Sequence, residues 1–430
     1  MGRQPFGLAS PAAWLRESGH QVTCVDLAVS PLPRNEAAHA QLIAFYLPMH
    51  TATRMAQSVL TQVKELNPDA HYVAYGLYAP LNKALLLERG IDTVLGGEFE
   101  AELLAIANGS TANSNPFELA KLAFKVPDRI GLPNLDRYAK LHVNGEARTV
   151  GYTEASRGCK HLCRHCPVVP VYQGQFRVVQ SDVVMEDVRR QVAAGAQHIT
   201  FGDPDFLNGP GHARKIVEQL HSEFPALTYD VIIKVQHLLN HRDMLPVLAQ
   251  TGCLFVTSAV ESLDDAVLEK LEKHHTRADF LKVVKLCREA GLAFVPTFIA
   301  FTPWTTISSY CELLKVLAEE GLATSVAPVQ LALRLLIPAG SRLLELEDVQ
   351  QRVDGFDSQA LVHRWKHPDH AVDALSARLL HLVDKEQKRG ADRMAIFSAV
   401  WQEAVGTALP VDYGIMPRAT VPYLDEPWYC

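Results

Sequence analysis

Apolar residues in the first hundred positions occur in short runs, and the stretches between these runs carry an apolar residue every three or four positions. Short runs of this kind are typical of buried parallel strands, and the longer period is typical of helices that cover a sheet. The expected strands are residues 22–27, 42–47, 71–76 and 93–95. The expected helices are residues 10–17, 52–66 and 80–89. This alternation predicts a doubly wound α/β domain over residues 1–107.

The beginning of this Rossmann-like domain lacks one expected element. Such a sheet normally has a strand that leads into its first helix, but the chain opens on a glycine-containing loop followed by a helix. We therefore expect a strand upstream of Met1. Residues 108–148 come next, and the weak periodicity and the Asn, Ser, Pro and Gly content of their first part predict a linker.

A second series of alternating strands and helices follows the linker. Its expected strands are residues 149–154, 197–202, 228–234, 254–259, 293–301 and 329–336. Its expected helices are residues 184–194, 211–223, 277–290 and 306–320. Six units of this spacing predict a partial (β/α)6 TIM barrel over residues 149–340, with its ligands at the carboxyl ends of the strands. Residues 341–430 are expected to be mainly helical, with helices at 371–387 and 394–405.

Composition limits the partners of the protein. The 430 residues are 48% hydrophobic and 21% charged, and the formal net charge is −7. Lys and Arg are scattered, so we expect no nucleic-acid partner. No run approaches the roughly 20 apolar residues of a membrane helix, so we expect no membrane partner. The N-terminus lacks the charged and then apolar order of a signal peptide, which predicts a cytoplasmic protein.

Three of the eight cysteines are clustered as Cys159, Cys163 and Cys166 in a loop after a predicted strand. Three thiolates within eight residues cannot share one helix face, but they can wrap a compact cluster. Iron–sulfur clusters normally take four thiolates, so three would leave one iron open to a ligand. The alternative is zinc, with His161 or His165 as the fourth ligand. The absence of a second ligand group nearby in the sequence favours the iron–sulfur cluster.

The Cys-x3-Cys-x2-Cys spacing, placed after a strand and at the start of a six-unit barrel, resembles the radical S-adenosylmethionine (SAM) superfamily over residues 150–336. The resemblance implies a 4Fe–4S cluster whose open iron holds SAM, and one-electron cleavage of SAM to a 5′-deoxyadenosyl radical. It also implies an electron donor such as flavodoxin or ferredoxin, and a small-molecule substrate.

Contacts with SAM are carried over by position. His165 stands before the third cysteine, where the family often has an aromatic residue beside the adenine. Gly202 and Asp203, in FGDPDF, occupy the turn after the second barrel strand that contacts the SAM amino group in the family, with Asp in place of the usual Glu.

Three further candidates lie on later strands. Ser258 and Glu261, in SAVES, resemble the fourth-strand segment that faces the ribose or the methionyl group. Arg334, on the expected sixth strand, is a candidate partner for the SAM carboxylate because Arg binds carboxylates in a bidentate manner.

A Rossmann-like domain ahead of such a barrel resembles the cobalamin-binding class of the superfamily. Strand-end residues would line the cobalamin crevice, and the candidates are Tyr46, His50, Gly76, Gly96 and Gly97. The chain has no Asp-x-His-x-x-Gly motif, so no histidine is assigned as the lower cobalt ligand. A domain that has lost cobalamin binding is the alternative.

The sequence ends in LDEPWYC, with Cys430 as the last residue. This end resembles radical SAM proteins whose tails read Cys-Cys-Ala-Glu-Pro or Cys-selenocysteine-Ala-Glu-Pro. We therefore expect the chain to continue past Cys430 through a UGA codon and to carry a redox-active tail.

The sequence as a whole predicts an enzyme that cleaves SAM reductively, with methyl transfer from cobalamin or another radical modification of a small molecule as its reaction. Two alternatives remain open. One is transfer of the aminocarboxypropyl group of SAM to a soft acceptor, and the other is a non-catalytic iron–sulfur redox or metal sensor.

Overall fold

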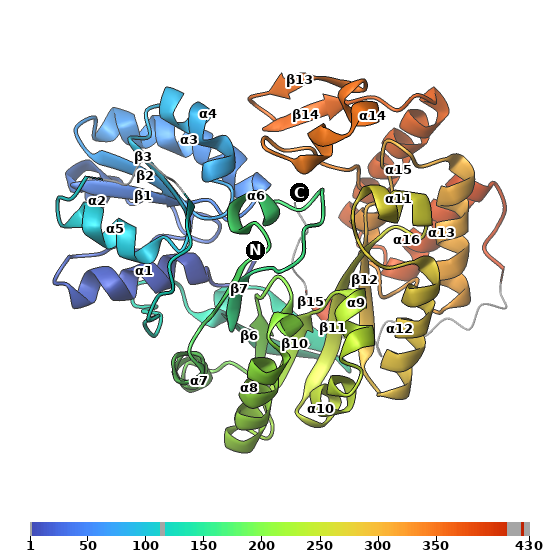
Figure 1. Ribbon diagram of the computed structural model, residues 1–430, viewed down its shortest axis with the longest axis horizontal. Coiled ribbons are helices and arrows are strands. Elements are labelled where there is room, and N and C mark those ends of the chain that lie inside the picture. The colour runs from blue at the N-terminus through green and yellow to red at the C-terminus, as the bar shows by residue number, and fades with distance from the viewer. Residues whose placement is uncertain (1, 112–116, 411–422, 425–430) are drawn as a thin grey trace.

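The computed structural model describes residues 2–111, 117–410 and 423–424. Cys430, and with it the predicted redox tail, lies outside these residues. The described chain forms an α/β molecule with two main sheets, one in the N-terminal part and one in the barrel (Figure 1). No helix in the described ranges combines the length and the apolar character needed to cross a bilayer.

The N-terminal sheet is parallel and has the strand order β1-β2-β3-β4. Its strands are β1 (Leu42–Tyr46), β2 (His71–Tyr75), β3 (Thr93–Gly97) and β4 (Phe117–Glu118). The strand expected at residues 22–27 is wrong, because the backbone there joins no ladder with the described strands. The carbonyl of Val22 instead accepts a hydrogen bond from Arg16 at 2.9 Å.

Helices cover both faces of this sheet. They are α1 (Phe6–Glu17), α2 (Arg34–His39), α3 (His50–Leu66), α4 (Lys83–Glu88) and α5 (Glu100–Ala107). Successive side chains of β2 point to opposite faces of the sheet, as in any β-strand. Tyr72 and Ala74 pack towards α3 and α4, whereas Val73 and Tyr75 pack towards α1 and α5. Burial on both faces explains the continuous apolar run that predicted this strand.

The barrel sheet has the order β12-β11-β10-β9-β6-β5-β15. Its strands are β5 (Lys140–Val143), β6 (Glu146–Thr153), β9 (His198–Phe201), β10 (Thr228–Ile232), β11 (Cys253–Glu261), β12 (Ala293–Phe298) and β15 (Tyr423–Leu424). The five strands from β6 to β12 are parallel, and β5 and β15 form an antiparallel edge.

Two expectations for this region need correction. The predicted linker, residues 108–148, contains β4 and the hairpin strand β5. The sixth barrel strand, expected at 329–336, is reduced to a single parallel bridge between Phe301 and Arg334. Proline explains the reduction, because Pro328 begins a 3-10 turn that ends at Leu331.

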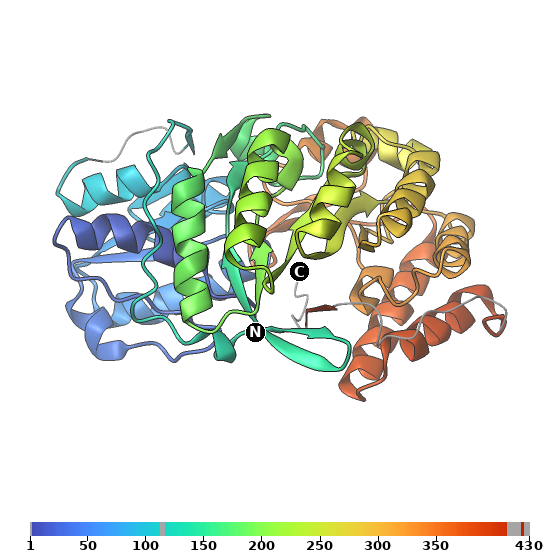
Figure 2. The same ribbon diagram turned by 90° about the horizontal axis from the view of Figure 1, so that it is seen from below.

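Helices cover the outside of the barrel sheet. They are α7 (Ser181–Ala193), α8 (Pro210–Glu223), α9 (Val235–Asn240), α10 (Met244–Gln250), α11 (Asp265–Lys270), α12 (Arg277–Glu289) and α13 (Ile307–Glu319). Seen from below, the longer ones stand side by side across the outer face (Figure 2). Thr276 and Thr306 begin α12 and α13 with reciprocal capping boxes, a signal that fixes where each helix starts.

The C-terminal region is not purely helical, which corrects the expectation for residues 341–430. It contains α14 (Glu347–Gln350), β13 (Val353–Asp357), β14 (Val362–Trp365), α15 (His370–Lys388) and α16 (Arg393–Val405). The strands β13 and β14 form an antiparallel hairpin. Figure 1 shows this hairpin near α3, α4 and α6, although it lies far from the N-terminal domain in the sequence.

Candidate functional site

The three clustered cysteines lie in a loop at the open end of the barrel. The loop begins with β7 (Ser156–Gly158), ends with β8 (Phe176–Val178), and carries the short helix α6 (Val169–Tyr172). Gly158 has φ +75°, and a Cβ there would lie 2.6 Å from the carbonyl oxygen of Gln175. Only glycine turns the chain into Cys159 without strain. Between the other two cysteines, the amide of Cys166 donates to the carbonyl of Cys163 at 3.1 Å.

Asp203, predicted to contact SAM, holds the start of the cysteine loop. Its buried carboxylate accepts hydrogen bonds from Ser156 Oγ at 2.5 Å and from the amide of Ala155 at 2.9 Å. Burial raises its pKa to about 7, against the effect of these donors. The preceding Gly202 leaves room for Tyr152, whose hydroxyl oxygen would lie 1.8 Å from an added Cβ. The predicted contact of both residues with SAM remains a prediction.

The free thiols of Cys159 and Cys166 are protonated near neutral pH. Burial raises the pKa of Cys159 to about 11 and that of Cys166 to about 12. A metal must therefore displace protons when these sulfurs bind it. The ammonium of Lys234, which follows β10, acts in the opposite direction by favouring the thiolate of Cys159. A buried cation beside three cysteines suits an anionic metal–thiolate centre.

Two of the predicted SAM residues meet each other. Nε2 of His165 lies 3.2 Å from Oε1 of Glu261, and Nζ of Lys273 lies 3.5 Å from the same oxygen. Burial alone would raise the pKa of Glu261, but Lys273 and His165 lower it to about 2. Glu261 has φ +70°, beside a register shift in β11, which turns its side chain to this contact. The carboxylate is therefore charged and fixed at the barrel mouth.

Several buried polar atoms around this pair have no hydrogen-bond partner in the described part of the chain. They are Nζ of Lys234, Nδ1 of His165 and both ring nitrogens of His275. Buried polar groups normally have partners, so this group fits a polar ligand such as SAM. Lys234, Lys273 and His275 were not predicted from the sequence. Their only signal was that Lys234 ends the strand expected at residues 228–234. Ser258 lies between Val256 and Val260 on the helix-covered face of β11, and its predicted contact with SAM remains a prediction.

The side chain of Arg334 contacts the C-terminal region of the chain. Its guanidinium lies 2.5 Å from Asp373, donates to the carbonyl of Trp365 at 3.2 Å, and stacks on the Trp365 ring at 3.9 Å. These contacts tie the last barrel segment to α15 and β14. They are a complete structural explanation for the residue, and its contact with the SAM carboxylate remains a prediction.

The strand ends of the N-terminal sheet carry the residues predicted for cobalamin. The ring of Tyr46 packs against Tyr75 and Phe99, with centroid distances of 5.4 and 6.3 Å. Gly76 has φ +103°, and a Cβ there would lie 3.0 Å from the carbonyl oxygen of Leu47 and from the Tyr46 ring. Gly96 and Gly97 end β3, where they pair with β4.

His50 begins α3 and is buried. Its Nε2 donates to the carbonyl oxygen of Ala360 in the β13–β14 hairpin at 2.6 Å, and its ring packs edge-on against Tyr78. This contact joins two segments 310 positions apart. A nitrogen engaged in this way is not available as a cobalt ligand.

Arg157 connects the cysteine loop with the segment that leaves the N-terminal sheet. Its guanidinium lies 3.1 Å from Glu98, 2.7 Å from Glu100 and 2.8 Å from Glu154. Glu98 and Glu100 are fully buried. One cation cannot balance three carboxylates, so burial, together with the repulsion of Glu100, outweighs Arg157 and raises the pKa of Glu98 to about 7. Tyr172 of α6 also donates to Glu98 at 3.2 Å.

Comparisons with known proteins agree with this geometry. Residues 153–317 match the profile of the Radical SAM superfamily. A hopanoid C-3 methylase of Methylococcus capsulatus is 23% identical over 70% of this chain and 62% of its own length. A tRNA-2-methylthio-N(6)-dimethylallyladenosine synthase of Desulfosudis oleivorans is 24% identical over half of each chain. The chain thus spans less than two thirds of these curated relatives.

Two solved structures share the fold. The cobalamin-dependent SAM radical enzyme OxsB, with aqua-cobalamin bound, superimposes with a TM-score of 0.73 at 13% identity, covering 89% of this chain and 65% of that one. The radical SAM methyltransferase TsrM from Kitasatospora setae, with tryptophan and a SAM analogue bound, gives a TM-score of 0.70 at 16% identity, covering 94% and 95%.

The cysteine loop, its position in a partial barrel and the matching profile define a radical SAM domain. Residues 153–317 are thus a radical SAM domain, and the overall fold of the chain is shared with OxsB and TsrM. The predicted α/β fold class and the predicted 4Fe–4S and SAM cofactors are confirmed at this level.

Proposed function

We propose that this radical SAM enzyme transfers a methyl group from cobalamin, held by its N-terminal domain, to a small-molecule substrate at the barrel mouth. The observation that carries this proposal is the buried junction of Arg157 with Glu98 and Glu100, which fixes the exit of the N-terminal sheet against the cysteine loop. Transfer between two cofactors requires that their sites face each other at a fixed separation.

Cys159, Cys163 and Cys166 are the residues that would hold the cluster. When bound, a 4Fe–4S cluster with one open iron supplies the electron that splits SAM into methionine and a 5′-deoxyadenosyl radical. The protein contributes a rigid loop start, fixed by Asp203, and a buried positive charge from Lys234. A fixed cation favours the thiolate state and the uptake of an anionic centre.

SAM itself brings a carboxylate, an ammonium and a sulfonium, and the barrel mouth offers complementary groups. Lys234 and His275 are buried without hydrogen-bond partners among the described residues. Lys234, whose ammonium also lies beside Cys159 and Cys163, is the candidate partner for the carboxylate of SAM. Glu261 is charged and held by His165 and Lys273, and it presents a fixed acceptor to the ammonium or the ribose hydroxyls.

Cobalamin would be taken up at the strand ends of the N-terminal sheet, beside Tyr46, Gly76, Gly96 and Gly97. No lower ligand is assigned in this proposal, and Nε2 of His50 is engaged by the carbonyl oxygen of Ala360. Two segments pack beside these strand ends, namely the turn with Leu77 and Leu81 and the helix α6. Leu77 and Leu81 contact the apolar face of α6, where Val171 and Tyr172 are buried.

The test uses the full chain with its cluster reconstituted without oxygen and hydroxocobalamin added. The protein is given SAM with a deuterated methyl group, a reductant that stands in for flavodoxin or ferredoxin, and a library of small molecules. Methyl transfer predicts S-adenosylhomocysteine and a deuterated product, both only when cobalamin is present. A control without cobalamin separates this activity from direct SAM cleavage.

Other outcomes would overturn the methyl-transfer proposal. Formation of 5′-deoxyadenosine with no cobalamin-dependent methyl product would assign another radical modification. Release of methylthioadenosine would assign aminocarboxypropyl transfer, and intact SAM beside a complete cluster would assign a sensor. Methylation of RNA but of no small molecule would contradict both the predicted substrate class and the expected absence of a nucleic-acid partner.

A further inference from the structure

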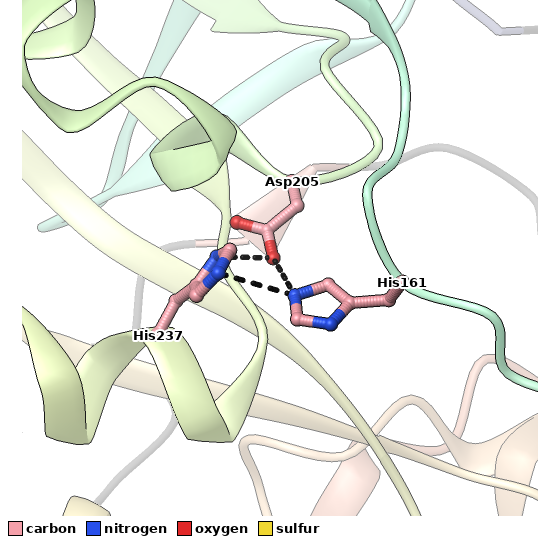
Figure 3. A group of neighbouring side chains, drawn as sticks. All are labelled: His161, Asp205 and His237. Atoms are coloured by element: carbon pink, nitrogen blue, oxygen red, sulfur yellow. Dashed lines mark hydrogen bonds and ion pairs between the residues drawn. The ribbon is translucent and has the colours of Figure 1, made fainter. Parts of the chain in front are cut away.

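Three side chains from distant parts of the sequence meet beside the cysteine loop. His161 lies in the loop itself, between Cys159 and Cys163; Asp205 follows β9; and His237 lies on α9 (Figure 3). Nε2 of His161 lies 3.2 Å from Nε2 of His237 and 3.6 Å from Oδ2 of Asp205. Figure 3 shows the carboxylate and both rings directed to a common point.

We propose that His161, Asp205 and His237 bind a divalent transition-metal ion, separate from the iron–sulfur cluster, with zinc as the ion to test. One ligand atom from each residue lies within 4.8 Å of the others. Ligands at about 2.0–2.1 Å from a tetrahedral zinc lie about 3.3 Å apart, which is close to the 3.2 and 3.6 Å that separate Nε2 of His161 from Nε2 of His237 and from Oδ2 of Asp205. Two imidazoles and one carboxylate suit the first-row divalent metals.

Hydrogen bonds within the group leave atoms unsatisfied. Asp205 and His237 are 1% and 3% exposed. Nδ1 of His237 lies only 2.8 Å from Oδ2 of Asp205, yet both atoms lack a hydrogen-bond partner in the described ranges, because the contact is not aligned as a hydrogen bond. Nitrogen and oxygen atoms that converge this closely, with lone pairs left over, are what a metal site contains.

The carboxylate of Asp205 is fixed in position for metal binding. Its other oxygen, Oδ1, accepts a hydrogen bond from the amide of Leu207 at 3.1 Å and begins a short 3-10 helix. This bond leaves Oδ2 free to face the two histidines. A ligating carboxylate that is itself hydrogen-bonded through its second oxygen is a common arrangement around metals.

The metal would have an open side. His161 and His237 line a pocket of about 520 Å³ whose other walls include Lys160, Gln236, Asn240 and His274. Three protein ligands leave at least one coordination position free, and here it would face this polar pocket. The site therefore suits a metal that binds a small polar ligand next to the radical centre. It does not depend on methyl transfer or on cobalamin.

The test measures zinc, iron and sulfide in the full chain with its cluster in place. After equilibrium dialysis against Zn²⁺, the protein is expected to hold about one zinc beside about four irons. Asp205→Asn keeps the Oδ1 acceptor for Leu207, and His237→Gln removes a second ligand. Each is expected to weaken zinc binding by at least about 10- to 100-fold, with iron unchanged.

His274→Asn is the matched control, because His274 lines the same pocket without belonging to the triad. This variant should keep zinc at the level of the unaltered chain. X-ray absorption at the zinc edge should show nitrogen or oxygen ligands near about 2.0 Å and no sulfur near about 2.3 Å. The proposal is overturned by zinc that stays bound in both ligand variants, by zinc with sulfur ligands that displaces iron, or by a cluster-loaded chain without zinc.

Discussion

The guanidinium of Arg157 lies 3.1 Å from the carboxylate of Glu98, and both side chains are buried. Arg157 stands two residues before the first cluster cysteine, and Glu98 directly follows β3 of the N-terminal sheet. The same guanidinium packs on the rings of Phe6, Phe99 and Phe124. This ion pair therefore makes the position of the cysteine loop depend on the N-terminal domain.

Replacement Arg157→Met tests this dependence. The variant leaves Glu98, Glu100 and Glu154 buried together without their shared cation, and removal of one partner of a buried ion pair typically costs about 3–5 kcal/mol. We expect a lower unfolding temperature and a lower iron content after reconstitution, measured by anaerobic scanning calorimetry and iron analysis. Arg190→Met, at an exposed ion pair on α7, is the control and should change little. Equal stability of the two variants would contradict the structural role of Arg157.

The raised pKa of Glu98 gives a dependence of stability on pH. Its pKa is about 7 in the folded chain, mainly because of burial, whereas the ordinary pKa of a glutamate is about 4.5. The folded state thus holds this proton more tightly than the unfolded state. The contribution to the free energy of unfolding is largest below pH 4.5, decreases as the pH rises towards 7, and is constant above that.

The variant Glu98→Gln isolates this effect. Denaturant unfolding of the cluster-free chain at pH 5 and at pH 8 should show a larger loss of stability in the unaltered chain than in the variant. All other titrating groups are shared, so the difference between the two chains belongs to Glu98 and to the neighbours coupled with it. Parallel pH profiles would show that Glu98 is not protonated in the folded state.

Lys234 is expected to contribute to SAM binding. Replacement Lys234→Met removes a buried ammonium that has no hydrogen-bond partner among the residues described. A hydrogen bond to a charged group contributes about 1.5–3 kcal/mol, so SAM affinity should fall by about 10- to 150-fold. Equilibrium dialysis with labelled SAM measures this change. Lys282→Met, at an exposed position on α12, serves as the control, and an affinity equal to that of this control would remove Lys234 from the site.

Replacement of Arg334 tests whether this residue binds SAM, as the sequence predicts, or has the structural role that its contacts indicate. Its pairing with Asp373 and its stacking on Trp365 predict that Arg334→Met lowers the unfolding temperature and leaves SAM affinity within about twofold. A loss of SAM affinity comparable to that of Lys234→Met, with no change in unfolding temperature, would instead support the contact with the SAM carboxylate.

Local signals predicted much of this molecule. The cysteine spacing is a local pattern, and it identified Cys159, Cys163 and Cys166 without any tertiary information. The strand β2 is buried on both faces, so its nearly continuous apolar run was visible in the sequence. The cap residues Thr276 and Thr306 mark helix starts for the same local reason.

The features that were missed depend on contacts between distant segments. The meeting of His161 with Asp205 and His237 requires two loops and the helix α9 to converge, and no single segment carries that information. His50 has its partner 310 positions away in a hairpin that the sequence did not predict. The reverse error, a strand at residues 22–27, arose because a strand needs a neighbour as well as an apolar run.

Reductive cleavage of SAM depends most directly on the three cluster cysteines. The decisive measurement is the nucleoside product formed from SAM by the anaerobically reconstituted chain with a reductant, compared with its Cys163→Ala variant. We predict 5′-deoxyadenosine from the unaltered chain, which should hold about four irons, and none from the variant. A chain that carries its full cluster and leaves SAM intact, or that holds zinc on these sulfurs, would contradict the account.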